Sequence, residues 1–220
     1  VLNNSSEELE GAALRKLFAD FAEQQIRYAV LRNHEQLPDR VGSRDIDLLV
    51  HPDDLKRAKT VILNLITYLG LSISDVFEDD MFFSIWFFRR LKQGLPFTLS
   101  VDLFPGRRVY GMELYSVEEA LSETRFHNGI PVVQERFVFL DKVMYNLAVG
   151  KPTHRKYDQL FARIARENYD QLVNHLSAFV GKTEAMMRID LTAAGSASAI
   201  PGLSKKERIR ILSRRLFQNP

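Results

Sequence analysis

The sequence contains no cysteine, and this absence excludes several classes of site. A disulfide scaffold, a thiolate zinc site and a cysteine nucleophile all need a residue that the chain lacks. The absence fits a reducing compartment, and we expect a cytoplasmic protein. Long apolar runs are missing as well, because the longest one, at 81–88, is far shorter than the roughly 20 residues of a membrane-spanning helix.

A large net charge is also missing, but the small total of +2 is unevenly distributed. Residues 151–220 contain 13 Lys and Arg against 6 Asp and Glu, whereas residues 1–150 contain 17 against 22. Because this acidic front part offers no basic track for a phosphate backbone, nucleic acid is not an expected partner.

The basic charge is concentrated in residues 205–215, where Ile209 and Leu212 recur at helical spacing among six Lys and Arg. This pattern permits peripheral contact with an anionic membrane surface or with a downstream domain, and a solvated helix is the alternative. A chain that begins at Val1 without Met and ends soon after a basic helix is expected to be part of a longer protein.

Hydrophobic periodicity predicts the fold class α+β, in which an α+β front part is followed by a C-terminal helical subdomain. Helices are expected over about 5–25 and 51–70, a short helix from Ser116, and an Asn-Gly hairpin turn at 128–129. Strands are expected at 28–31, 45–50, 71–77, 81–91 and 97–104, the last three as antiparallel neighbours.

The rear part is predicted to be helical, over 135–149, 157–164, 169–179 and 183–191. A run of small residues at 193–202 is typical of a linker. The predicted division is therefore an α+β core over 1–134, a helical subdomain over 135–192, and a linker with a basic amphipathic helix over 193–220.

Three aspartates are the candidate catalytic and metal-binding residues. Asp45 and Asp47 are two positions apart on a predicted strand, so alternation places both carboxylates on the same face. Asp102 lies in another strand that is otherwise apolar apart from two hydroxyl residues. If the two strands are neighbours, the three carboxylates converge, and oxygen ligands of this kind suit Mg²⁺ or Mn²⁺. An exposed strand face is the alternative interpretation of the first pair.

These residues resemble the signature of the nucleotidyltransferase superfamily, which includes DNA polymerase β, aminoglycoside nucleotidyltransferases and CCA-adding enzymes. That signature has a strand, a glycine turn, about a dozen residues, an acid-x-acid strand and a third acid two strands later. More narrowly, residues 28–50 look like a bacterial branch near surface-polysaccharide functions, in which a P-loop kinase-like domain sometimes follows. The resemblance covers about residues 8–180, and it implies a nucleotidyltransferase-like mixed β-sheet with flanking helices.

The resemblance implies a Mg²⁺-dependent or Mn²⁺-dependent transfer of a nucleoside monophosphate from a nucleoside triphosphate to a small acceptor, such as a sugar or sugar phosphate. Asp45 and Asp47 would hold the metal, and Asp102 would complete the site and help to deprotonate the acceptor. The alternative is a catalytically degenerate member that serves as a binding or scaffold domain of a larger protein.

The expected nucleotide-binding residues are Arg32, Asn33, Arg44 and Lys142. Arg32 and Asn33 stand where the superfamily has its glycine turn. Arg32 would either bind a phosphate through two guanidinium hydrogen bonds or pair with an acid at the strand end, and Asn33 would donate a hydrogen bond. The alternative interpretation of Arg44 and Lys142 is that each is a charged residue on the protein surface.

Aromatic residues are concentrated between positions 82 and 88, in the same region as the longest apolar run. Stacking of nucleic-acid bases on these rings is one interpretation. A hydrophobic strand that covers a helix is the favoured one.

Overall fold

The computed structural model describes residues 5–41, 45–92, 95–109, 111–149, 151, 153–200 and 202–209. The chain divides into two compact units, residues 1–106 with 116–134, and residues 107–115 with 135–220. This grouping differs from the predicted division in that residues 107–115 belong with the helical part of the chain.

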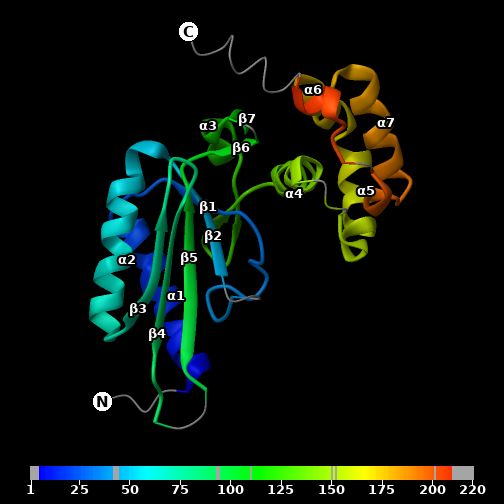
Figure 1. The fold of residues 1–220 in the computed structure, drawn as a ribbon. Coiled ribbons are helices and arrows are strands. Elements are labelled where there is room, and N and C mark those ends of the chain that lie inside the picture. The colour runs from blue at the N-terminus through cyan, green and yellow to red at the C-terminus, as the bar shows by residue number, and fades with distance from the viewer. Residues whose placement is uncertain are drawn as a thin grey trace. The chain divides into compact units, whose positions relative to one another are not determined.

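The first unit is built on a seven-stranded mixed sheet with helices α1 (Ser6–Glu23), α2 (Leu55–Leu69) and α3 (Val117–Ser122) (Figure 1). The strand order in the sheet is β3-β4-β5-β2-β1-β9-β8. The strands are β1 (Tyr28–Val30), β2 (Asp45–Val50), β3 (Ser72–Glu78), β4 (Phe83–Arg89), β5 (Phe97–Phe104), β8 (Arg125–His127) and β9 (Ile130–Val132). A mixed sheet with flanking helices is thus confirmed, as are β3, β4 and β5 as antiparallel neighbours.

The ends of these elements follow from specific residues. Ser5 and Glu8 form a capping box at the start of α1, each accepting a hydrogen bond from the backbone N–H of the other. α2 ends at Gly70, whose φ of 61° is a conformation that glycine adopts without steric cost. Asn128 and Gly129 have φ angles of 49° and 79°, as the turn between β8 and β9 requires.

The core of the first unit lies between the sheet and the helices α1 and α2, which cover the same face (Figure 1). Strand alternation sends one set of side chains from β2, β4 and β5 into this core, and all of them are buried: Ile46, Leu48, Phe83, Ile85, Phe87, Leu99, Val101 and Leu103. The intervening residues of the same strands point to the opposite face, which carries Asp45, Asp47 and Asp102.

In its described residues, the second unit contains a two-stranded hairpin, four longer α-helices and a shorter helical segment at 205–209. The hairpin is formed by β6 (Arg107–Val109) and β7 (Met112–Tyr115). The helices are α4 (Glu135–Val149), α5 (Asp158–Glu167), α6 (Tyr169–Val180) and α7 (Lys182–Ala193), so each predicted helix of the rear part is confirmed to within a few residues.

The segment predicted as a linker over 193–202 packs on the second unit. Ala197 is fully buried, and Ser198 donates two hydrogen bonds to the Asp158 carboxylate, at 2.8 Å from its backbone nitrogen and 2.9 Å from its hydroxyl. Residues 205–209 are helical, and the rest of the predicted basic helix lies outside the described residues. Within the described part of the chain, every helix is too short or too polar to cross a membrane.

Candidate metal centre

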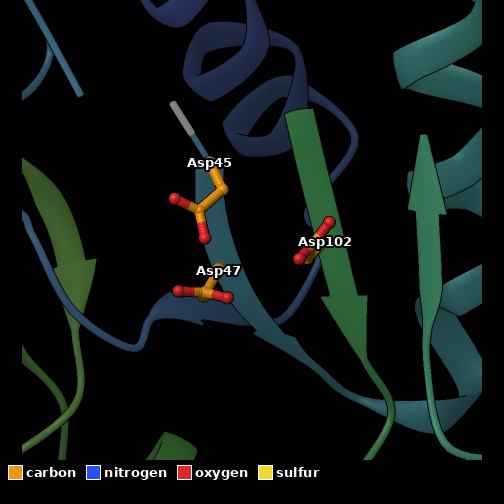
Figure 2. A group of neighbouring side chains, drawn as sticks. All are labelled: Asp45, Asp47 and Asp102. Atoms are coloured by element: carbon orange, nitrogen blue, oxygen red, sulfur yellow. The ribbon is translucent and has the colours of Figure 1, made fainter. Parts of the chain in front are cut away.

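The parallel pairing of β2 with β5 brings the three predicted aspartates together. Asp47 stands opposite Asp102 in the strand register, and Asp45 stands opposite Ser100. Because paired residues point to the same face of a sheet, all three carboxylates lie on the face opposite to helices α1 and α2. One oxygen from each carboxylate lies within 4.8 Å of the other two (Figure 2). The predicted convergence is therefore confirmed.

Asp102 is held in place by two serine hydroxyls. Ser84 of β4 donates to Oδ1 of Asp102 at 2.6 Å, and Ser100 donates to the same oxygen at 3.0 Å. Both serines are buried, and Ser84 stands directly opposite Asp102 between neighbouring strands. Because both hydroxyls bond to Oδ1, the other oxygen, Oδ2, takes no hydrogen bond from them.

Asp47 is the most buried of the three carboxylates, with 3% of its side chain exposed. Burial raises the pKa of Asp47, the Arg32 guanidinium lowers it in part, and the neighbouring charges of Asp45 and Asp102 raise it further. The ionised form of Asp47 is therefore disfavoured at this place. A cation between the three carboxylates would reverse this effect, because it stabilises the ionised form of each.

Arg32 provides a positive charge beside this cluster. It follows β1, where the backbone N–H of Leu31 donates to the Asp47 carbonyl at 2.9 Å and fixes the chain beside β2. Nε of Arg32 donates to Oδ2 of Asp47, and a terminal nitrogen lies 3.9 Å from Oδ2 of Asp45. Of the two interpretations left open by the sequence, pairing with an acid is the one that the structure contains, and phosphate binding by Arg32 stays a prediction.

The turn after β1 has a backbone conformation that glycine adopts easily. Asn33 has a φ of 57°, in the left-handed region, where asparagine is one of the few other residues tolerated. Asn33 thus adopts a backbone conformation that is typical of glycine, although its side chain occupies more space than glycine does.

The structure does not test the other two predicted nucleotide-binding residues. Arg44 lies outside the described residues. Lys142 lies on α4 in the second unit, whereas the aspartates belong to the first unit. The roles of both residues in nucleotide binding therefore stay predictions.

Sequence analysis missed the two serines that hold Asp102. The available signal was a polar residue at alternate positions of an otherwise apolar strand, which places Ser100 and Asp102 on the same face. Ser84 lies in the run of aromatic residues, where it is the polar exception. Its pairing with Asp102 depends on the register of β4 against β5, which the sequence does not contain.

The donor set fits a divalent cation with a preference for oxygen. All three ligand atoms are carboxylate oxygens from two rigid neighbouring strands, as Mg²⁺ and Mn²⁺ require. Comparison of the chain with protein-family models gives no match, and comparison with curated proteins gives none at a significant level. The functional assignment therefore depends on the geometry of this centre.

Proposed function

We propose that the chain is a Mg²⁺-dependent or Mn²⁺-dependent nucleotidyltransferase, which moves a nucleoside monophosphate from a nucleoside triphosphate to a small acceptor. The observation that supports it is the convergence of Asp45, Asp47 and Asp102 on the sheet face opposite to helices α1 and α2. In the proposed reaction, an acceptor oxygen forms a bond to the α-phosphorus. The bond from that phosphorus to the β-phosphate oxygen breaks, and pyrophosphate leaves.

Each aspartate has a part in this reaction. Asp45 and Asp47 hold the divalent cation, which would stabilise the charge of the phosphates and of the attacking oxygen. Asp102 completes the cluster, and its Oδ2 accepts the proton of the acceptor hydroxyl. The hydroxyls of Ser84 and Ser100 orient Asp102 for this transfer because they hold its other oxygen.

Besides its ion pair with Asp47, Arg32 is proposed to bind the phosphates of the nucleoside triphosphate. When a cation neutralises Asp47, the guanidinium becomes available to bind two phosphate oxygens with a planar pair of N–H donors. The positive charge beside the aspartates is then supplied by the cation instead of by Arg32. A sugar or sugar phosphate is the proposed acceptor, and the support for it is the family resemblance of residues 28–50.

A second candidate function is that of a binding or scaffold domain without catalysis. The observation that favours it is the ion pair between Arg32 and Asp47, which already neutralises the most buried carboxylate. In this alternative, Arg32 keeps its place and prevents the binding of a divalent cation. The two functions therefore make opposite predictions about metal binding.

Metal binding can be measured through Trp86, which is the single tryptophan of the chain. Trp86 stands opposite Ser100, which stands opposite Asp45, so two strand spacings of about 4.8 Å separate Trp86 from the cluster. Mn²⁺ is paramagnetic and quenches tryptophan fluorescence at such short range. We expect saturable quenching of the wild-type protein by Mn²⁺ and its loss in Asp47→Asn.

Asp170→Asn is the matched control, because Asp170 is an exposed aspartate on α6. It should leave the quenching unchanged. The activity test then measures pyrophosphate release from each nucleoside triphosphate with a panel of sugars and sugar phosphates. Quenching with pyrophosphate release that Asp47→Asn abolishes would support the enzyme. Absence of Mn²⁺ binding would refute it and favour the scaffold domain.

A further inference from the structure

The aromatic residues between positions 82 and 88 are divided between the two faces of the sheet. Phe83 and Phe87 are buried against the helices, as the sequence analysis favoured. Trp86 points to the opposite face, because it is two positions from Ser84, whose hydroxyl contacts Asp102. Its side chain is large and apolar, yet 44% of Trp86 is exposed. The favoured interpretation thus explains Phe83 and Phe87 but does not explain Trp86.

Trp86 lies on the same face of the sheet as the three carboxylates, on the strand next to that of Asp102. Its partner across β4 and β5 is Ser100, and Asp102 is the diagonal neighbour of Trp86. Diagonal neighbours of this kind are about 7–8 Å apart, which is within reach of an aromatic side chain. An exposed indole ring therefore borders the candidate metal centre on the β4 side.

The two sides of the cluster have different chemical character. Arg32, which follows β1, lies on one side and carries a positive charge. Trp86 on β4 lies on the other side, because β5 and β2 separate β4 from β1 in the sheet. A nucleoside triphosphate has the matching polarity, with an anionic phosphate chain at one end and a planar ring at the other. The separation of Trp86 from Asp45 by two strand spacings is comparable to the length of a nucleoside.

We infer that Trp86 forms the base-binding subsite of this protein, in which the indole ring stacks on the nucleobase of the bound nucleoside triphosphate. This inference rests on the proposed function, because the carboxylates and their cation fix the phosphates. Stacking on a planar ring contributes comparably for every base, since each base has an aromatic face. The subsite therefore takes nucleoside triphosphates as a class and does not by itself select one base.

Calorimetric titration can separate base binding from phosphate binding. The two probes are inorganic triphosphate and a set of four ribonucleoside triphosphates, each with Mg²⁺. We expect the best nucleotide to bind the wild-type protein about 5- to 100-fold more tightly than inorganic triphosphate, which is the effect of one stacked base. Trp86→Leu should remove this difference and leave the affinity for inorganic triphosphate unchanged.

Two further variants separate stacking from folding. Trp86→Phe keeps an aromatic ring in a strand position, so it should retain most of the preference for the nucleotide. Phe126→Leu is the matched control, because Phe126 is an exposed aromatic residue on β8 at the opposite edge of the sheet. It should bind both probes like the wild type. Circular dichroism would verify that all three variants are folded.

The outcomes distinguish this inference from the proposed function. If inorganic triphosphate with Mg²⁺ fails to bind, both are overturned. If inorganic triphosphate binds but Trp86→Leu binds nucleotides as tightly as the wild type does, only the base-binding subsite is overturned. A loss of nucleotide affinity in Trp86→Leu that Trp86→Phe restores would support the inference.

Discussion

Replacement of Asp47 by asparagine should change the stability of the protein in opposite directions with and without metal. Asp47 is buried and its pKa is raised, so the ionised carboxylate is less stable in the folded chain than in the unfolded chain. The ionised Asp47 lowers the free energy of unfolding by its full amount at pH values above its pKa in the folded chain. This effect is absent at pH values below its pKa in the unfolded chain. At pH 8 and without metal, the wild type therefore carries a cost that Asp47→Asn removes.

The magnitudes can be worked out for each condition. The neutral amide should stabilise the metal-free protein by about 0.5–2 kcal/mol, which is the usual range for a single stabilising substitution. Arg32 loses a partner, but Asp45 is within 3.9 Å of its guanidinium and limits this loss. With Mn²⁺ at a hundredfold excess over its dissociation constant, the wild type should gain about 2.7 kcal/mol, and the variant should gain little.

Urea denaturation followed by circular dichroism would measure both free energies of unfolding, in EDTA and in Mn²⁺. The variant should be the more stable protein in EDTA and the less stable one in Mn²⁺. Asp170→Asn should follow the wild type in both conditions. A variant that is clearly less stable than the wild type in EDTA would refute the reasoning, because the pair of Arg32 and Asp47 would then be a net source of stability.

Two other buried charges lead to predictions about folding alone. Asp54 accepts hydrogen bonds from the backbone and side chain of Arg27, and it forms an ion pair with Arg57. The hydrogen bond from the Arg27 side chain is the main reason why the pKa of Asp54 is well below its usual range. Both arginines are half-exposed, so solvent screens part of their interaction with Asp54, and Asp54→Asn should lower the free energy of unfolding at pH 7 by about 2 kcal/mol. Urea denaturation should show that this difference shrinks as the pH falls below about 4. An equal difference at every pH would contradict the assignment. Arg188 is buried and donates to Glu184 at 2.7 Å and Glu207 at 2.9 Å, so Arg188→Met should cost about 2–4 kcal/mol. Amide hydrogen exchange should then show faster exchange over 203–209, and unchanged exchange there would contradict it.

The sequence was sufficient to predict the strands that carry the three aspartates. β2 begins and ends where the alternation of Asp45, Ile46 and Asp47 and the following apolar residues predict it. The convergence with Asp102 was conditional on the two strands being neighbours. That condition depends on a parallel pairing between distant segments, and a shift of the register by one residue would send Asp102 to the helix-covered face.

Other elements of the fold could not be predicted, because their sequences are too short or too uniform to show a hydrophobic period. β6 and β7 have only three and four residues, which is too short for a period to be recognised, so the hairpin over 107–115 was missed. Composition favoured a linker over 193–202 because its residues are small. Small residues also pack closely, and the hydrogen bonds from Ser198 to Asp158 show that this segment packs against α5.

Arg32 connects the folding of the first unit with its proposed chemistry. A cluster of three carboxylates on a sheet face needs a positive charge if the chain is to fold before it meets a cation, and the guanidinium provides that charge. A glycine at this position would leave Asp47 buried without a counterion. The presence of Arg32 and Asn33 after β1 is therefore compatible with the proposed activity. The enzyme and the scaffold domain differ in one property, which is whether a cation and a phosphate together compete successfully with Asp47 for Arg32.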